Sequence, residues 1–312
     1  MTKENLAFVF PGQGSQKIGM MADLAAQYPV VEQTFTEASA VLGYDLWDMV
    51  QNGEQSDINL TERTQPLLLT ASVALWRIWN EKAGPKPALM AGHSLGEWSA
   101  LVCSGVVAFA DAVKLVQQRG KFMQAAVPAG EGAMAAIIGL DDDKIEAACQ
   151  QAAGDEVVSA VNFNSPGQVV IAGHAGAVDR AIELCKEAGA KRAMPLPVSA
   201  PFHTSLMRPA ADQLAEQIQA TTFNAPETLI VHNVNAQTES DPEKIKALMI
   251  EQIYHPVLWV DCVKTLASKG IVTTLECGPG KVLSGLSKRI DKSLKGLATE
   301  TPDVLDKALA EA

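Results

Sequence analysis

The sequence GHSLG at 92–96 matches the motif G-x-S-x-G, in which a serine stands between two glycines. It follows a short apolar run at 88–92 and precedes a helical pattern, which is the strand–turn–helix context of a nucleophilic serine. In such a turn the Ser94 hydroxyl is exposed. The first N–H of the helix, that of Leu95, points to where an oxyanion would form. The alternative is a Gly-Ser-Gly turn that only connects a strand to a helix.

A serine hydroxyl is a weak nucleophile that needs a neighbouring base, most often a histidine. His203 lies in the loop SAPFHT at 199–204, where the chain returns from a smaller folding unit to a larger one. Because clefts between such units bind ligands, we expect His203 to be the base, with a buried structural histidine as the alternative. We expect His93 to pack or hydrogen-bond locally, His174 to cap a helix, and His232 to lie in a strand.

Two further segments carry groups that could serve a site built around a nucleophilic serine. The Gly-rich loop FPGQGSQ at 10–16 follows the first strand, but Lys17 stands where a dinucleotide-binding loop needs its third glycine. Such a loop can instead present a backbone N–H to an oxyanion. Arg119 lies in the helical segment 117–121, and its planar fork would bind a carboxylate bidentately if it faces the cleft. The alternative for Arg119 is an ordinary solvated helix residue.

The elements around these residues predict an α/β fold with a mostly parallel sheet. Short buried-strand patterns alternate with longer helical patterns at both ends of the chain. The expected strands lie at 6–10, 88–92, 228–234 and 272–278, and the expected helices at 20–43, 64–84, 111–127, 204–219 and 242–253.

The middle of the chain follows a different order. From 130 to 198 the pattern is β-α-β-β-α-β, which is the order of a ferredoxin-like unit. We therefore predict an α/β-hydrolase-like main domain made of 1–129 and 199–312, interrupted by a ferredoxin-like small domain at 130–198.

Composition limits the possible functions. The chain has 312 residues, 47% hydrophobic and 20% charged, which is typical of a compact globular protein. Its net charge of −11 argues against a protein that coats nucleic acid or an anionic membrane. The five cysteines are widely spaced without a C-x-x-C pair, so we expect neither a disulfide framework nor a metal site. With no signal peptide or membrane span in the pattern, we expect a cytoplasmic monomer.

Several motifs in one order make the chain resemble a known family. GHSLGE, the opening FVFPGQGSQ, the isolated QQRG and the loop SAPFH resemble the malonyl-CoA:acyl carrier protein transacylases of bacterial fatty-acid synthesis. The resemblance covers nearly the whole chain, including VNFNSPGQVVIAG and the late GPGKVLSGL. It implies ping-pong transfer of a malonyl group from malonyl-CoA to the phosphopantetheine thiol of acyl carrier protein. It also implies no cofactor, since the coenzyme A thioester is a substrate.

The resemblance assigns roles to single residues. It implies that Ser94 carries the malonyl ester and that His203 is the base. It also implies that Arg119 binds the malonyl carboxylate, while the main-chain carbonyl of Gln252 orients the histidine. The bulky Phe202 before the base implies selection of malonyl over methylmalonyl. Oxyanion N–H groups come from two residues in the family, which correspond here to Gln13 and Leu95.

Two other classes of protein fit parts of the sequence. An esterase or thioesterase of the α/β-hydrolase type would explain the serine motif. Such hydrolases rarely carry a ferredoxin-like insertion at this place, and nothing in them requires Arg119. A non-catalytic module that binds carrier protein is disfavoured because Ser94, His203 and Arg119 are all present.

An acidic chain that receives coenzyme A and an acidic carrier protein needs a local basic patch. Between 281 and 295, five basic residues stand against one acid, Asp291. We expect two basic groups to flank the mouth of the cleft and steer the carrier protein by complementary charge. The alternative is an ordinary solvated helix face. The expected docking residues are Lys191, Arg192, Lys288 and Arg289.

Overall fold

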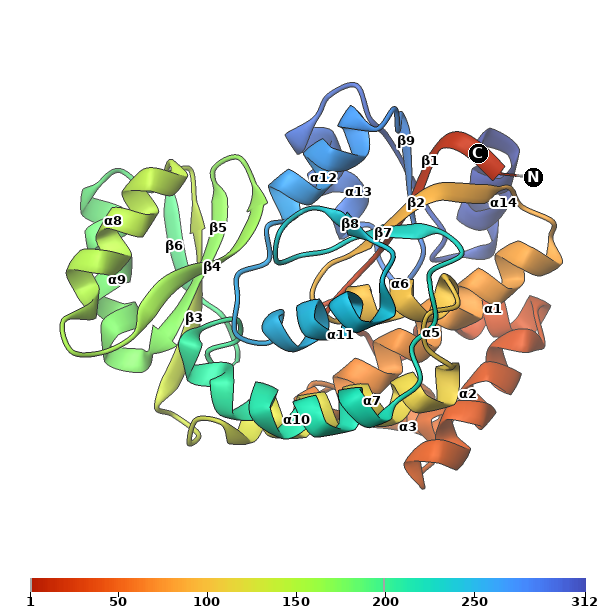
Figure 1. Ribbon diagram of the computed structural model, residues 1–312, viewed down its shortest axis with the longest axis horizontal. Coiled ribbons are helices and arrows are strands. Elements are labelled where there is room, and N and C mark those ends of the chain that lie inside the picture. Colours follow the sequence, from red (N-terminus) through yellow and green to blue (C-terminus); the bar gives the residue numbers. More distant parts are fainter. Residues whose placement is uncertain (1, 199) are drawn as a thin grey trace.

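Two β-sheets organise the computed structural model, which describes residues 2–198 and 200–312. Met1 and Ser199, the first residues of the two predicted main-domain segments, lie outside the described residues. One sheet has six strands in the order β10-β9-β1-β2-β7-β8, and the other has four in the order β4-β5-β3-β6. The four-stranded sheet and its two helices form a separate lobe at one end of the molecule (Figure 1).

The larger sheet is built around β1 (Thr2–Phe10), which lies between β9 and β2. The pairs β1–β2, β1–β9, β9–β10 and β2–β7 are parallel, while β8 runs antiparallel to β7. The predicted α/β class with a mostly parallel sheet is therefore confirmed. The other strands of this sheet are β2 (Lys86–Gly92), β7 (Leu229–Val231), β8 (Thr238–Glu239), β9 (Thr273–Glu276) and β10 (Lys295–Ala298).

Side chains of β1 alternate between two hydrophobic cores, because successive residues of a strand point to opposite faces. Leu6, Phe8 and Phe10 enter the larger core, with residues of α2, α5, α6 and α7. Ala7 and Val9 enter a second core, with residues of α12 and α13. Both faces of the sheet are therefore covered, which explains why the run at 6–10 is uniformly apolar.

The helices around the larger sheet depart from the expected ones in several places. The pattern at 20–43 forms two helices instead of one, because Tyr28 is extended and Pro29, which lacks an N–H, is the N-cap of the second helix. The helix expected at 64 begins at Thr61. The helices are α1 (Ala22–Gln27), α2 (Val30–Leu42), α3 (Leu46–Asn52), α4 (Gln55–Ile58), α5 (Thr61–Glu81), α6 (Leu95–Cys103), α7 (Phe109–Ala125), η1 (Ser205–Met207), α10 (Arg208–Ala220), α11 (Pro242–Glu251), α12 (Trp259–Ser268), α13 (Val282–Ile290) and α14 (Pro302–Glu311).

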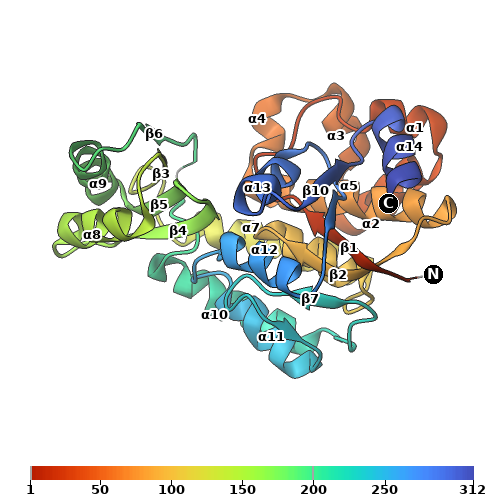
Figure 2. The ribbon, with the colours of Figure 1, turned by 90° about the horizontal axis from the view of Figure 1, so that it is seen from above.

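The smaller lobe follows the β-α-β-β-α-β order that the sequence predicts. All its strand pairs are antiparallel. Most of its buried side chains form a hydrophobic core of their own, while Met134, Val161, Val170 and Ala172 belong to the larger core. The helices α8 and α9 lie side by side over one face of its sheet (Figures 1 and 2). Its elements are β3 (Gly132–Ile138), α8 (Asp142–Ala153), β4 (Val158–Ser165), β5 (Gln168–His174), α9 (Ala175–Glu187) and β6 (Arg192–Pro195).

Backbone hydrogen bonds from β4 join the lobe to the rest of the molecule. The N–H of Phe163 donates to the carbonyl of Val257 at 3.1 Å, and the N–H of Val257 donates to the carbonyl of Val161 at 2.8 Å. Close by, His93 Nε2 lies 2.7 Å from Asn164 Oδ1. These contacts place the lobe next to His93, the residue that precedes Ser94. None of the helices in the described ranges is both long and apolar enough to cross a membrane.

Candidate active site

The motif GHSLG forms a tight turn from β2 into α6, with Ser94 at φ 51° and ψ −110°. A Cβ at Gly92 would lie 2.0 Å from the backbone of Gly96. A Cβ at Gly96 would in turn lie 2.0 Å from the carbonyl oxygen of Phe10. Only glycine fits at these two positions. The surrounding backbone therefore holds Ser94 in a conformation that non-glycine residues rarely adopt.

The structure brings Ser94 and His203 together across 109 residues of sequence. Ser94 Oγ lies 2.8 Å from His203 Nε2. On the other side of the ring, Nδ1 lies 2.8 Å from the carbonyl of Gln252 and 3.1 Å from that of His255. Because carbonyl oxygens only accept hydrogen bonds, Nδ1 carries the proton and Nε2 turns its lone pair toward the serine. This is the tautomer that a base needs.

Burial controls the charge of the His203 ring, which is 3% exposed. Desolvation and the nearby Arg119 guanidinium lower the pKa of His203 to about 3, although its hydrogen bonds to the carbonyls of Gln252 and His255 oppose this shift. A histidine with so low a pKa is neutral throughout the physiological range. It is therefore ready to accept a proton from Ser94.

Arg119 is 1% exposed and turns its fork toward the serine. Its Nη1 donates to Gln65 Oε1 at 2.9 Å, and its Nη2 donates to Gln252 Oε1 at 2.9 Å and to Ser94 Oγ at 3.3 Å. Its Nε has no hydrogen-bond partner among the described residues. Burial lowers the pKa of Arg119 to about 10, and the charge of Glu97 opposes the shift. The guanidinium is therefore still cationic near neutral pH and has donors left for an anion.

These groups line a cavity of about 130 Å³ between the smaller lobe and the larger sheet. The lobe contributes Met134 and Asn162, and the segment that follows it contributes Leu196 and Val198, so one wall is largely apolar. Gln252 is fully buried and is not among the residues that line the cavity. Six residues expected at the site do line it: Gln13, Ser94, Leu95, Arg119, Phe202 and His203.

The sequence model of the acyl transferase domain family matches residues 7–301 of this chain. This chain belongs to the acyl transferase family. The malonyl CoA-acyl carrier protein transacylase of Salmonella typhimurium is 58% identical over 305 residues, which cover 98% of this chain and 99% of the relative. That of Escherichia coli strain K12 is 59% identical over 303 residues, covering 97% and 98%.

Solved structures agree with this assignment. An acyl carrier protein S-malonyltransferase from Vibrio cholerae superposes with a TM-score of 0.96 at 59% identity, covering 97% of this chain and 99% of that one. A malonyl-transacylase in complex with a type II polyketide-synthase acyl carrier protein gives a TM-score of 0.98 at 54% identity, covering 99% and 100%. The resemblance to the malonyl-CoA:acyl carrier protein transacylases is confirmed.

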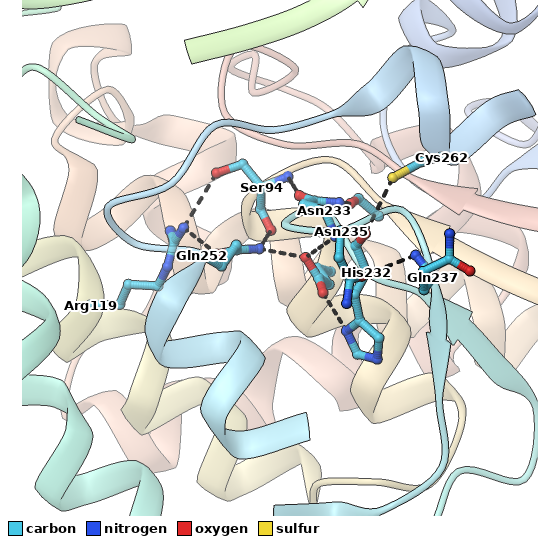
Figure 3. Close-up of polar contacts among 10 residues, drawn as sticks. Ser94, Arg119, His232, Asn233, Asn235, Gln237, Gln252 and Cys262 are labelled. Carbon is cyan, nitrogen blue, oxygen red and sulfur yellow. Dashed lines mark hydrogen bonds and ion pairs between the residues drawn. The ribbon is translucent and has the colours of Figure 1, made fainter. Parts of the chain in front are cut away.

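Several polar residues of this acyl transferase were not found by sequence reasoning. Asn233 holds the serine turn, since its Oδ1 accepts from the Ser94 N–H at 2.8 Å and its Nδ2 donates to the Gly92 carbonyl at 2.7 Å. The side chain of Gln252 lies between Ser94 and Arg119 (Figure 3). The motif and the resemblance place only the main chain of Gln252 at the site. No local sequence pattern indicates that the side chains of Asn233 and Gln252 lie beside Ser94, because only the fold brings them together.

Two of the expectations for histidines need correction. His232 lies just after β7 and not in the strand, and its Nδ1 is 2.6 Å from Glu97 Oε1. His174 occupies the N-cap position of α9, but its ring accepts from the N–H of Val157 instead of capping the helix. In both cases a tertiary partner replaces the local one. His93 packs beside Trp259, with ring centroids 5.5 Å apart, and its ring also reaches Asn164, 71 residues away.

The four expected docking residues are exposed and lie outside the cavity lining. Arg289 Nη1 donates to Gln168 Oε1 at 3.0 Å. Gln168 pairs with Ile138 across the small sheet, and Ile138 pairs with Arg192 on the next strand. The two basic groups therefore meet at one end of that sheet. Nowhere in the described ranges do three or more His, Cys, Asp or Glu side chains gather so as to hold a metal ion.

Proposed function

We propose that this acyl transferase moves a malonyl group from malonyl-CoA to the phosphopantetheine thiol of acyl carrier protein, through an ester on Ser94. One observation carries the proposal. Ser94 Oγ lies 2.8 Å from the base nitrogen of His203 and 3.3 Å from Nη2 of Arg119, so a nucleophile, a base and a receptor for a carboxylate meet at one atom. The names of the relatives support the same reaction, and a hydrolase has no need for the arginine.

In the first half-reaction, His203 Nε2 takes the hydroxyl proton as Ser94 Oγ attacks the thioester carbonyl. The oxyanion then sits opposite two backbone N–H groups, those of Leu95 and Gln13. The N–H of Leu95 is the first of α6 and has no acceptor within the helix. When the carbon–sulfur bond breaks, the imidazolium returns the proton to the sulfur of coenzyme A, which leaves as a thiol.

The second half-reaction reverses these steps with a new thiol. Neutral His203 removes the proton of the phosphopantetheine thiol, and the sulfur attacks the malonyl-Ser94 ester. Collapse of the tetrahedral intermediate releases Ser94, which recovers its proton from the histidine. The carbonyl of Gln252 stabilises the imidazolium in both halves by accepting from Nδ1. The Arg119 fork holds the malonyl carboxylate throughout.

Incubation with malonyl-CoA followed by intact mass measurement tests this function. A persistent malonyl adduct that disappears when acyl carrier protein is added supports the transferase. Rapid turnover to free malonate would indicate the esterase or thioesterase instead, and an unchanged mass would indicate a non-catalytic binding module.

The pH dependence of acylation tests the state of His203. A base acts when it is neutral, and the pKa of His203 is lowered to about 3, so the base is active at every pH well above that value. We expect kcat/KM for a malonyl N-acetylcysteamine thioester, which carries no phosphate, to stay flat from about pH 5 to about pH 8. An inflection near the usual histidine pKa would contradict this assignment of the free enzyme.

Phe202 is proposed to select the acyl group. It is 9% exposed, lines the cavity and precedes the base in sequence, so it crowds the α-carbon of a bound acyl chain. One methyl group in a pocket is worth about 1–3 kcal/mol, so we expect wild type to prefer malonyl-CoA over methylmalonyl-CoA by about tenfold or more. Phe202→Ala is expected to lower the ratio of kcat/KM for malonyl-CoA to kcat/KM for methylmalonyl-CoA. Equal kcat/KM for both substrates in wild type would refute the role.

Carrier-protein docking is proposed at the basic end of the small sheet, with Lys191, Arg192, Lys288 and Arg289. Charge reversal at Arg192 and Arg289 to glutamate is expected to slow transfer to carrier protein about tenfold at low salt, and less at high salt. Acylation by malonyl-CoA is expected to change much less.

The matched control for docking is Lys114→Glu, an exposed lysine on α7. It should leave transfer to carrier protein unchanged. Unaltered carrier-protein kinetics in the Arg192 and Arg289 variant at low ionic strength would place docking elsewhere. Lys295, at the end of the basic segment, is not included because it forms an ion pair with Glu311 at 2.7 Å.

We also propose the domain division expected from the sequence, an α/β-hydrolase-like domain of 1–129 and 199–312 and a ferredoxin-like domain of 130–198. The separate hydrophobic core of the lobe and its antiparallel order β4-β5-β3-β6 support it. Expression of 130–198 alone, followed by thermal unfolding, tests whether it folds.

A cytoplasmic location is proposed from the five free cysteines, which are typical of a reducing compartment. Cell fractionation tests this location. No cofactor is proposed beyond the two thioester substrates, and activity after dialysis against a chelator tests this.

A further inference from the structure

A buried carboxylate lies directly behind the serine turn, and the proposed reaction gives it no task. Glu97 is in the first turn of α6 and is 1% exposed. A carboxylate in such a place is costly unless hydrogen bonds satisfy it. Three donors do so: His232 Nδ1 at 2.6 Å, Gln252 Nε2 at 2.8 Å and the N–H of Asn233 at 3.3 Å.

The donor from Gln252 links this carboxylate to the active site. Both hydrogens of the Gln252 amide are used, because Nε2 also donates to the Ser94 carbonyl at 2.9 Å. The amide oxygen must then point the other way, and it accepts from Arg119 Nη2 at 2.9 Å (Figure 3). An ionised carboxylate can only accept hydrogen bonds, so Glu97 excludes the flipped amide, whose oxygen would face the carboxylate with no hydrogen between them and whose NH₂ group would face the Arg119 donor.

The Gln252 amide separates the Glu97 carboxylate from the Arg119 guanidinium, and this leaves Arg119 available for its substrate. A carboxylate in direct contact with the guanidinium would form a strong bidentate pair and compete with an incoming carboxylate. Amide oxygens of Gln65 and Gln252 instead hold one N–H each at the end of the fork. The Nε–H lacks a partner in the described part of the chain, and the second N–H of Nη2 points to Ser94 Oγ at 3.3 Å, the atom that would carry the acyl group.

We propose that Glu97 is a positioning residue for recognition of the malonyl carboxylate, acting through the amide of Gln252 to aim the Arg119 fork at the acyl group on Ser94. The proposal rests on the proposed function, because it concerns selection of a malonyl over an acetyl group. An acetyl group has no carboxylate, so its transfer does not depend on how the fork is aimed.

The central test replaces the buried pair with apolar side chains of similar size, Glu97→Met together with His232→Leu. Replacement of both partners of a buried hydrogen bond by apolar groups of similar shape can be nearly neutral, whereas removal of one partner is costly. We expect the ratio of malonyl to acetyl acylation rates on Ser94 to fall about tenfold or more, which corresponds to about 1.4 kcal/mol. A folded double variant with the wild-type ratio overturns the proposal.

The conservative variant Glu97→Gln separates positioning from a general structural role. Its amide oxygen can still accept from Gln252 and Asn233, while its NH₂ group can donate to His232 in the other tautomer. Most of the malonyl preference should therefore be retained. A loss as large as in the double variant would assign the effect to the missing charge and overturn positioning by hydrogen bond.

A second route keeps the proposal testable if the double variant does not fold. Gln252→Met removes the amide link but keeps the main-chain carbonyl that contacts His203, and it should lower the malonyl preference as much as the double variant. An unchanged ratio in Gln252→Met also overturns the proposal. The matched control is Glu276→Gln, another buried carboxylate, which accepts from the N–H groups of Leu283 and Ser284 at the start of α13.

Wild type distinguishes failure of this proposal from failure of the proposed function. A wild-type enzyme that forms no malonyl adduct refutes the transferase and, with it, the positioning role. A wild-type enzyme that forms the adduct, beside a folded double variant with unchanged preference, refutes the positioning role alone.

Discussion

Replacing Ser94 by alanine is expected to abolish the malonyl adduct, while replacing His203 by alanine is expected to slow its formation by about 10²–10⁴-fold. The two effects differ in kind because the serine supplies the atom that is acylated, whereas the histidine only speeds removal of its proton. Rapid-quench intact mass measurement with malonyl-CoA separates them. The His203 variant should still bind malonyl-CoA, which calorimetry measures.

Two control variants match these substitutions. Ser99→Ala removes a buried serine of α6, the helix that follows Ser94, and its hydroxyl has no hydrogen-bond partner within the described residues. His174→Ala removes a histidine of the smaller lobe. Both should acylate at the wild-type rate. A mass increase in the Ser94 variant, or a wild-type rate in the His203 variant, would refute the assignments.

The serine turn could be predicted from the sequence because its determinants are local. A short apolar strand, two glycines and a helical start suffice to define it, and the structure explains each glycine by a backbone approach of 2.0 Å. The order of elements in the smaller lobe was predictable for a similar reason, since its two helices and the strands β3, β4 and β5 are each long enough to show their period. Short elements such as β8, with two residues, carry no such period and were not expected.

The surroundings of the serine could not be predicted, because they depend on tertiary contacts. Asn233 reaches the Ser94 N–H from 139 residues away, and Gln65 reaches Arg119 from 54 residues away. An isolated asparagine or glutamine in a sequence looks like any surface polar residue. The resemblance to a family pointed to the carbonyl of Gln252, but the task of its side chain follows only from the distances to Glu97 and Arg119.

Arg119 gives the second large effect, on the choice of acyl group. Arg119→Ala is expected to lower malonyl transfer by about 10²–10³-fold, since loss of a buried charged partner costs about 2–5 kcal/mol. Acetyl transfer should fall far less, because an acetyl group has no carboxylate to leave unpaired. The preference for malonyl over acetyl should therefore collapse, and competition between the two coenzyme A thioesters measures this ratio directly.

Two further variants make this result specific to the fork. Arg119→Lys keeps the charge but loses the paired donors, so it should restore only part of the malonyl preference. Arg77→Ala removes an arginine of α5 that contacts Thr34 and Glu37, outside the cavity, and should leave the ratio unchanged. If Arg119→Ala transfers malonyl and acetyl groups in the wild-type ratio, the carboxylate is held by another residue, and the guanidinium beside Ser94 serves only to fix Gln65 and Gln252.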